Sequence, residues 1–289
     1  MPGCITIEAT IGADGYKSGT WEVAYKAAAD MPVYGQLFDF EKADVSDLKV
    51  EWASATSNIR AATADGDEKA IAFDVDTTNS RYFGIQFPRP DWYDTFNKVS
   101  FTIKIERKSG DSAISPFGRS NWTINDDGEY VPGTSENAVT VSMGQKITVT
   151  ICNKDVSVWE QLEKGAGVLR LPFGVPANTV NEFTIYITDI EFGYTDITVE
   201  EGTELDIAAE LGLTDEIIEN VKFNDVTVSD ITALKPDKSG TLTFTLKKAG
   251  YKQSRTICVK IVVKEKVVDD GSGEKDNDVE WKDSWSNQL

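Results

Sequence analysis

The sequence has no histidine among its 289 residues. This absence removes the side chain most often used as a general base, the imidazole ligand of many metal sites, and every Ser-His or Cys-His nucleophile. Any catalysis by this chain would have to rely on carboxylates, lysine or tyrosine. Only a narrow set of enzyme classes therefore remains open.

Cysteine is scarce as well. The three cysteines, Cys4, Cys152 and Cys258, lie far apart in the chain. An odd number at such spacing excludes a disulfide framework and a clustered zinc site. Because Cys152 and Cys258 lie within apolar runs, the sequence predicts buried, unreactive thiols in strands.

Positive charge is in short supply. The chain has 29 lysines and arginines against 48 aspartates and glutamates, which gives a net charge of −19. Nucleic-acid binding draws its affinity from Lys and Arg that neutralise phosphates, so we expect no nucleic-acid partner. An anionic membrane surface is disfavoured for the same reason. A neutral glycan is not repelled by this charge, so a sugar partner is permitted.

Long apolar runs are also missing. No stretch approaches the roughly 18 apolar residues of a membrane-spanning helix, and the chain does not open on a basic and apolar signal sequence. The sequence therefore predicts no membrane insertion. A signal peptide that has already been removed is compatible with this start.

Alternation of apolar and polar residues dominates what is present. In residues 70–76 (AIAFDVD), Ile71, Phe73 and Val75 alternate with small or acidic side chains, which is typical of a half-buried strand. The same pattern predicts strands at 5–11, 19–25, 48–55, 82–87, 98–106, 138–143, 146–152 and 183–192. Turn-forming residues separate these segments, and one short helix is expected at 156–162. Many short strands with frequent turns predict an all-β sandwich.

A second pattern of strands begins near residue 196. A chain of this length predicts about two domains, and residues 196–267 contain their own predicted strands at 196–200, 204–209, 240–247 and 255–263. We therefore expect a β-sandwich domain over 1–195 and a smaller β-domain over 196–267 that serves as a spacer. Residues 268–289 are acidic and polar, which predicts a linker or disordered tail.

Four segments of the first domain resemble jelly-roll carbohydrate-binding modules of the galactose-binding-like type. The segment 37–41 (LFDFE) and the strand 66–73 (GDEKAIAF) are similar to the opening of such modules. The segment 91–101 (DWYDTFNKVSF) is similar to the family's central turn and strand, and 183–192 (FTIYITDIEF) to its closing strand. Residues 196–267 resemble bacterial immunoglobulin-like repeats. The resemblance implies a jelly-roll sandwich followed by an immunoglobulin-like sandwich, in a secreted or cell-surface bacterial protein.

The resemblance also implies a structural calcium ion. In the family, calcium often joins the first strand to the last, and the matching positions are Glu41 and Asp189. Calcium takes six to eight oxygen ligands, so backbone carbonyls would have to complete the site. The alternative is an accidental pair among the 48 acidic residues.

Aromatic residues in polar surroundings are the first candidates for a sugar site. The apolar face of a pyranose ring stacks on a flat aromatic ring, while planar polar groups bind its edge. Trp92, Tyr93, Trp122 and Trp159 lie in segments that are polar on both sides. We therefore expect exposed stacking residues at these positions. The alternative for any one of them is a half-buried core residue.

Strand alternation gives a second group of candidates, whose side chains point away from the predicted core. These residues are Tyr82, Gln86, Lys104, Arg170 and Tyr186. If they share one sheet, they would line an outer face that has the loop aromatics at its edge. The alternative is a solvated strand face without a ligand.

These observations predict a non-catalytic, extracellular protein that binds a neutral polysaccharide. A glucan is the leading candidate, with a starch-like α-glucan slightly favoured, since separated aromatic rings suit a curved chain. The protein would act within a multidomain or multiprotein glycan-degrading system. Two alternatives remain open: a cell-surface adhesin or scaffold domain that binds protein, and a glycoside hydrolase that uses paired carboxylates.

Overall fold

The structure is a computed structural model. It describes residues 3–9, 19–25, 31–110, 115–116, 122–124, 130–132, 146–153, 156–175 and 179–265, and the statements below refer to these residues. Three features discussed above lie outside this description: the predicted strand at 138–143, the tail 268–289 and the side chain of Cys4. None of the described helices is long and apolar enough to cross a membrane.

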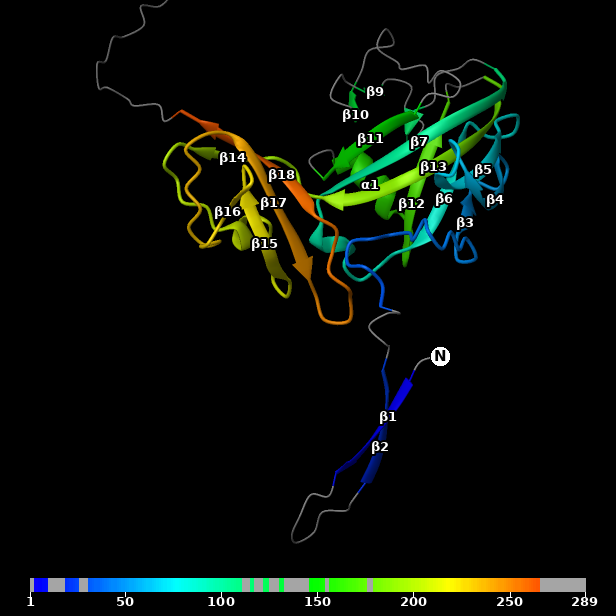
Figure 1. Cartoon of the computed structure of the whole chain (residues 1–289). Helices are drawn as coiled ribbons and strands as arrows, with labels where there is room; N and C mark the ends of the chain where they lie inside the picture. The colour runs from blue at the N-terminus through cyan, green and yellow to red at the C-terminus, as the bar shows by residue number, and fades with distance from the viewer. Residues whose placement is uncertain are drawn as a thin grey trace, which may run out of the picture.

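The first unit is a β-sandwich, as predicted (Figure 1). Its larger sheet has the strand order β11-β7-β13-β5-β4 and is antiparallel throughout. These strands are β4 (Thr56–Thr63), β5 (Lys69–Asp76), β7 (Lys98–Ser109), β11 (Lys146–Cys152) and β13 (Glu182–Gly193).

The smaller sheet has the order β3-β6-β12-β8. Its strands are β3 (Lys49–Glu51), β6 (Tyr82–Pro88), β8 (Ser115–Pro116) and β12 (Val168–Gly174). The helix α1 (Val156–Glu163) contacts β12, close to the predicted position. A single 3-10 turn, Tyr93–Thr95, precedes β7.

Aromatic side chains fill the space between the two sheets. Phe173 of the smaller sheet lies against Phe73 and Phe101 of the larger one, with ring centroids 6.5 and 5.8 Å apart. Phe83 meets Phe183 edge-on at 5.2 Å. All five are at most 1% exposed, so the inward positions predicted by alternation are confirmed.

The second unit contains one five-stranded sheet with the order β14-β18-β17-β15-β16. Its strands are β14 (Ile197–Glu200), β15 (Ile217–Phe223), β16 (Val226–Thr227), β17 (Gly240–Lys247) and β18 (Ile257–Lys264). The pair β14–β18 is parallel, and the other pairs are antiparallel. The immunoglobulin-like assignment stays a prediction.

Two short hairpins lie outside these sheets. The strands β1 (Gly3–Ala9) and β2 (Gly19–Tyr25) pair antiparallel, as do β9 (Trp122–Ile124) and β10 (Tyr130–Pro132).

Three local predictions are wrong. The strand expected at 204–209 is replaced by the short helix α2 (Ile207–Glu210), because the Asp206 carboxylate caps it by accepting from the Ala209 amide at 3.1 Å. Cys152 is only partly buried and Cys258 is exposed, because both lie on the outward side of their strands. The strand expected at 48–55 stops at Glu51.

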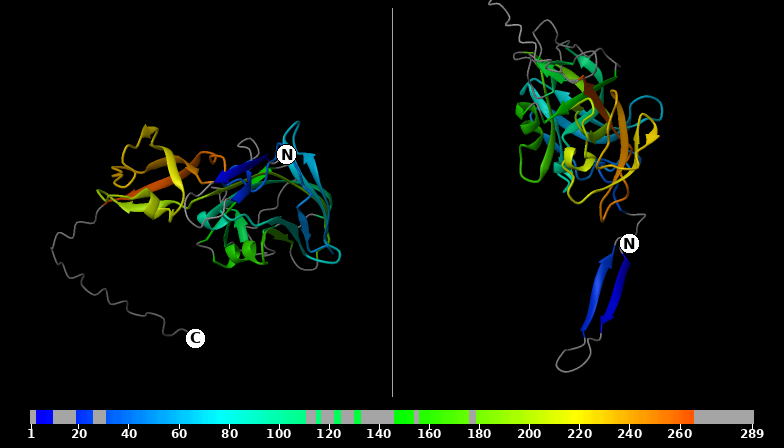
Figure 2. Two further views of the ribbon diagram at one scale, coloured as in Figure 1. Left: turned by 90° about the horizontal axis from the view of Figure 1, so that it is seen from below. Right: turned by 90° about the vertical axis from the view of Figure 1, so that its left-hand side faces the viewer.

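The two units share one continuous cluster of buried apolar side chains. Figures 1 and 2 show the second unit beside the end of the sandwich where β13 finishes. A backbone bridge joins Val33 to Lys252, and the ring of Tyr194 lies 6.1 Å from that of Phe244. The contact between the units therefore includes buried side chains on both sides of the connection, Tyr194 and Phe244 among them. The domain boundary near residue 195 stays a prediction.

Candidate functional site

A strained turn begins where β3 ends. Trp52 follows Glu51 directly, and its backbone adopts φ 56°, a left-handed conformation that bulky residues rarely adopt. The Trp52 carbonyl accepts from the amides of Ala55 and Thr56 at 2.9 and 3.0 Å, which closes the turn into β4. Such strain costs of order 1–3 kcal/mol and persists mainly at functional positions.

The indole of Trp52 lies beside the ring of Tyr82 on the outer face of the smaller sheet. The two ring centroids are 5.8 Å apart, and the ring planes meet at 35°. Both side chains are partly exposed. Tyr82 reaches this face because it alternates with Phe83, which points into the core.

A buried ion pair supports the indole. Arg170 of β12 is 6% exposed, and its guanidinium carbon lies 4.8 Å from the centre of a Trp52 ring. The guanidinium is paired with the Glu51 carboxylate and donates to the Lys164 carbonyl at 3.3 Å. Its Nε is buried and has no partner in the described part of the chain. An unsatisfied buried donor of this kind is a place where a bound water or ligand hydroxyl gains a hydrogen bond.

Planar polar groups complete the edge of this face. Strand register places Gln86 beside Arg170, and the Gln86 amide donates to the Glu51 carboxylate. The Arg81 guanidinium lies 4.7 Å from the centre of the Tyr82 ring and donates to its hydroxyl. We call Glu51, Trp52, Arg81, Tyr82, Gln86 and Arg170 the Trp52 face.

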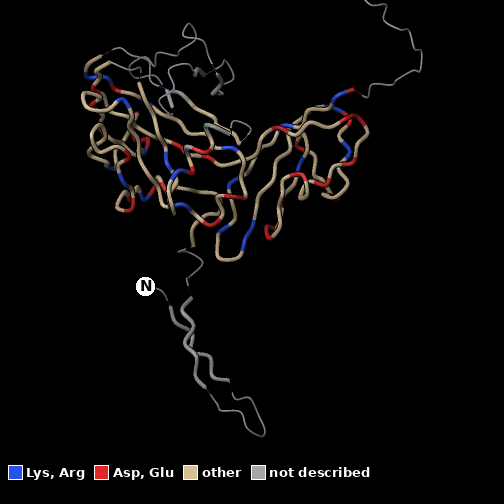
Figure 3. Tube along the Cα trace, turned by 180° about the vertical axis from the view of Figure 1, so that it is seen from behind, with Lys and Arg blue, Asp and Glu red and all other residues tan. Residues whose placement is uncertain are grey.

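The Trp52 face combines the two elements of a sugar site. Two adjacent aromatic rings offer an apolar surface, while a carboxylate, an amide and two guanidinium groups surround it. Along both units, Lys and Arg are interspersed with Asp and Glu (Figure 3). A neutral ring with several hydroxyl groups fits this arrangement, because each planar group binds hydroxyls without requiring a charge on the ligand.

Three of the aromatic residues expected to be exposed are buried. Trp92, Tyr93 and Trp159 are 2, 1 and 9% exposed, so their rings do not present a face to solvent. Their polar sequence neighbours misled the prediction, because a 3-10 turn and a helix direct the rings inward. Trp122 lies in β9, and its side chain is outside the described residues.

Contacts among aromatic rings explain this burial. The Trp92 indole meets Phe192 at 5.2 Å, edge-on, and Tyr93 stacks on Trp159 at 5.7 Å. Trp159 donates from its Nε1 to Glu163 at 2.8 Å. Burial and the nearby Glu163 carboxylate raise the pKa of Tyr93 far above its usual value, as expected for a core tyrosine.

The outward-facing candidates belong to two different sheets. Tyr82, Gln86 and Arg170 are brought together on the Trp52 face. Lys104 and Tyr186 lie on the larger sheet, because β13 pairs with β5 and β7 and not with β6 or β12. The expectation of one shared face is therefore wrong for these two residues.

Lys104 and Tyr186 are also engaged by other side chains. Lys104 is 8% exposed and donates to Asp65 at 2.8 Å and to the Ala64 carbonyl at 3.0 Å. The Tyr186 hydroxyl donates to Glu106 at 3.0 Å. These contacts stabilise the larger sheet without need of a ligand.

Sequence reasoning did not select Trp52. A signal was available: Trp52 lies inside the predicted strand 48–55 and is followed by the small and polar residues 53–58 (ASATSN). Its left-handed backbone has no sequence signature, since that conformation normally indicates glycine or asparagine.

The predicted calcium ligands do not form a cluster in the described residues. Among these residues, no group of three or more acidic or cysteine side chains is placed to hold a metal ion. Glu41 is exposed, and Asp189 accepts from Arg255 at 3.3 Å. Two side chains fall short of the ligand number that calcium needs, so the ion stays a prediction without a supporting contact.

No protein-family model and no curated protein matches the chain. Among solved structures, the chain is similar to a carbohydrate-binding module of the beta-sandwich superfamily that is described for its promiscuous specificity. The two share 15% sequence identity with a TM-score of 0.31, and the match covers 66% of this chain and 74% of that chain. It is also similar to CBM28, a carbohydrate-binding module described as specific for non-crystalline cellulose, with 12% identity and a TM-score of 0.31 over 56% of this chain and 93% of that chain. Likeness at this level carries no functional argument.

Proposed function

We propose that the protein binds a neutral polysaccharide, without catalysis, on the Trp52 face. The observation that carries the proposal is the partly exposed Trp52–Tyr82 ring pair, held on a strained backbone and surrounded by planar polar groups. Exposed aromatic rings lower solubility, so an aromatic pair at the surface favours a binding role. The strained backbone of Trp52 is not needed to fill the core, which favours a functional role as well.

A glucan is the proposed ligand, with a curved α-glucan of the starch type favoured. Successive rings of a curved chain present faces at an angle, and the 35° between the Trp52 and Tyr82 planes suits such a chain better than a flat one. The net charge of −19 disfavours polyanionic glycans, which this protein would repel. A secreted or cell-surface bacterial protein of a glycan-degrading system is the setting in which this activity would serve.

The chemistry of the Trp52 face supports binding rather than hydrolysis. Glycoside hydrolysis needs two carboxyl groups on either side of the scissile bond. Within the Trp52 face Glu51 is the one carboxylate, and it is already engaged by Arg170 and Gln86. A reducing-sugar assay with starch, β-glucan, xylan and mannan checks this, with no product expected from any of them.

Replacing Trp52 tests the proposed site. We expect Trp52→Ala to weaken binding to the best oligosaccharide by about 30-fold, or about 2 kcal/mol, because the larger stacking ring is lost. Affinity electrophoresis on starch, β-glucan, xylan and mannan identifies the ligand, and calorimetry gives the affinity. Tyr186→Ala is the matched control, because Tyr186 is a partly exposed aromatic on the other sheet.

A glycine variant separates binding from stability. Glycine adopts a positive φ freely, so Trp52→Gly should unfold at the same temperature as Trp52→Ala or higher while binding equally poorly. Parent-like affinity in both variants would show that the sugar does not stack on Trp52. Unchanged migration of the parent protein in every gel would contradict polysaccharide binding itself.

A further inference from the structure

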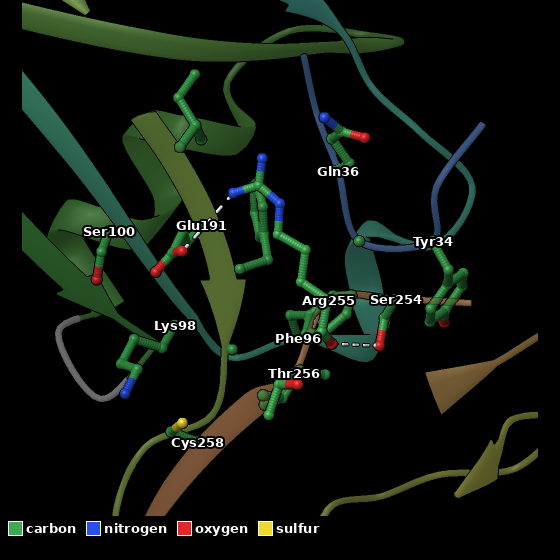
Figure 4. A pocket seen from close by; sticks show the side chains of 15 residues that line it. Tyr34, Gln36, Phe96, Lys98, Ser100, Glu191, Ser254, Arg255, Thr256 and Cys258 are labelled. Carbon is green, nitrogen blue, oxygen red and sulfur yellow. Dashed lines mark hydrogen bonds and ion pairs between the residues drawn. The ribbon is translucent and has the colours of Figure 1, made fainter. Parts of the chain in front are cut away.

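A cavity lies where the two units meet, away from the Trp52 face. Its volume is about 350 Å³, and its walls come from β7, β13, the start of β18 and residues 34–36 (Figure 4). Figure 4 shows Lys98, Ser100 and Cys258 on one side and Gln36 and Tyr34 on the other, with Arg255 between them. We call this cavity the junction pocket. It has the size of a small-molecule site, and such sites are frequent between domains.

The walls of the junction pocket are held in place by buried polar contacts. The Tyr34 hydroxyl donates to Glu216 of the second unit at 2.7 Å, and Lys248 donates to the same carboxylate at 2.9 Å. Backbone bonds of 3.1 and 2.9 Å tie Tyr34 and Pro32 to Lys252. Because the two walls cannot separate freely, a ligand that binds between them loses little free energy to ordering the walls.

The lining combines an apolar base with a polar rim. Phe96, Phe192 and Ile257 are buried and contribute apolar surface. The rim carries four polar groups: the Lys98 ammonium, the Ser100 hydroxyl, the Glu191 carboxylate and the Arg255 guanidinium. An apolar base beneath a few convergent polar groups is the usual composition of a binding pocket.

The charges of the rim are balanced but incompletely paired. Arg255 lies 3.3 Å from Asp189 and 3.7 Å from Glu191, so one cation serves two carboxylates. Although the Glu191 side chain is 60% exposed, partial desolvation and the neighbouring Asp189 raise its pKa. No carboxylate oxygen of the described residues lies within 4.0 Å of the Lys98 ammonium. Asp189 lies outside the lining, but it pairs with Arg255, so the two cations Lys98 and Arg255 are matched by the two carboxylates of Asp189 and Glu191. The rim together with this partner therefore has spare hydrogen-bond donors and acceptors without a net charge.

We propose that the junction pocket binds a neutral sugar of one or two rings, such as the end of a glycan chain. Sugar hydroxyls would donate to Glu191 and accept from Lys98, while the C–H face of the ring covers the apolar base. Balanced charge selects against anions and cations alike. The site is independent of the Trp52 face, since it is built from other strands and from both units.

A glycine in the wall allows the pocket to be filled. A Cβ at Gly193 would meet only the Lys98 Cε, at 3.7 Å, and Gly193 is not among the glycines with positive φ. Gly193→Leu should therefore occupy the junction pocket without straining the backbone. Lys98→Ala and Glu191→Ala remove polar groups instead, so they test the same site if the leucine lowers the melting temperature.

The experiment uses the full chain carrying Trp52→Ala, so that the Trp52 face does not contribute. Amide chemical shifts are followed during titration with glucose, maltose, cellobiose and glucuronate, up to about 10 mM. We expect saturable shifts at Ser100, Gly193 and Thr256 with a neutral sugar, weakened at least tenfold by Gly193→Leu, Lys98→Ala or Glu191→Ala. No saturable shift with any neutral sugar, stronger binding of glucuronate, or unchanged binding in all three variants would overturn the proposal.

Discussion

The carboxylate of Glu216 joins the two units from a nearly fully buried position, and we predict that it dominates the acid sensitivity of the fold. Its side chain is 3% exposed. It accepts from the hydroxyls of Tyr34 and Thr95 at 2.7 and 3.2 Å and from the Lys248 ammonium at 2.9 Å. Three donors on one buried carboxylate stabilise its ionised form strongly.

The size of the effect follows from linkage. Burial alone would raise the pKa of Glu216, but the Tyr34 hydroxyl and the Lys248 ammonium outweigh it and lower the pKa from 4.5 to about 2. This difference corresponds to about 3 kcal/mol of folding free energy. Because the pKa is lower in the folded state, that contribution is complete above about pH 5 and is lost as the pH falls toward 2.

The test compares the parent with Glu216→Gln, whose side chain is neutral like the protonated acid. We expect the variant to be less stable by about 3 kcal/mol at pH 7, because the partly buried Lys248 loses its partner. Toward pH 2 the two proteins should converge in stability. Urea unfolding at several pH values gives both curves.

Glu204→Gln is the matched control, since Glu204 pairs with Lys235 at 2.7 Å but is 58% exposed. A surface pair of this kind contributes at most about 1 kcal/mol. If the difference between parent and Glu216→Gln stays constant from pH 7 to pH 3, or is absent at pH 7, the carboxylate is not held ionised as described. The stability of Glu204→Gln is compared with that of the parent in the same way. If its difference from the parent shrinks toward pH 2 as much as that of Glu216→Gln does, the pH effect is not specific to the junction.

Two further predictions follow from burial. Trp92→Ala should lower the free energy of unfolding by about 3–5 kcal/mol, measured by urea titration, and leave polysaccharide affinity unchanged at temperatures where the variant is folded. Removing residues 196–289 uncovers Tyr34 and Tyr194, so we expect the remaining sandwich to lose about 3 kcal/mol or more and to melt at a lower temperature in calorimetry. An unchanged free energy of unfolding in Trp92→Ala would contradict the burial of Trp92. An unchanged melting temperature in the shortened protein would contradict the packing between the two units.

The fold class and the inward faces of single strands could be predicted from the sequence, because alternation is a local property. The strands β5, β6, β7, β11 and β13 begin and end within three residues of their predicted bounds. Phe83, Ile85 and Phe87 are buried as the pattern required.

The pairing of the strands could not be predicted in this way. Tyr82 and Tyr186 show the same alternation with core residues, yet β6 pairs with β12 and β13 pairs with β5 and β7. Pairing depends on contacts between residues that are about 100 positions apart, and nothing local to either tyrosine encodes it. The candidate face was therefore divided between two sheets.

Burial of the tryptophans shows a related limit. Polar neighbours in sequence indicated exposure for Trp92, but the 3-10 turn that begins after it directs both Trp92 and Tyr93 into the core while Asp91 stays exposed. Trp52 shows the converse case, because one residue with positive φ ends the expected strand and leaves the indole on the surface. Both outcomes depend on backbone geometry over one to a few residues, which a periodic pattern averages out.

The role expected for the second unit changes most. As a spacer, it would need only its own core and a flexible connection. Residues 196–267 contain three aromatic residues, Phe223, Phe244 and Tyr251. Instead, Tyr251 packs edge-on against Tyr34 at 5.5 Å and its hydroxyl donates to Asp91, so its own polar and aromatic groups are used at the junction. Burial and the Asp91 carboxylate raise the pKa of Tyr251 to about 12, so this donor stays protonated even in mildly alkaline solution. A unit fixed in this way supplies one wall of the junction pocket, which a freely hinged spacer could not keep in shape.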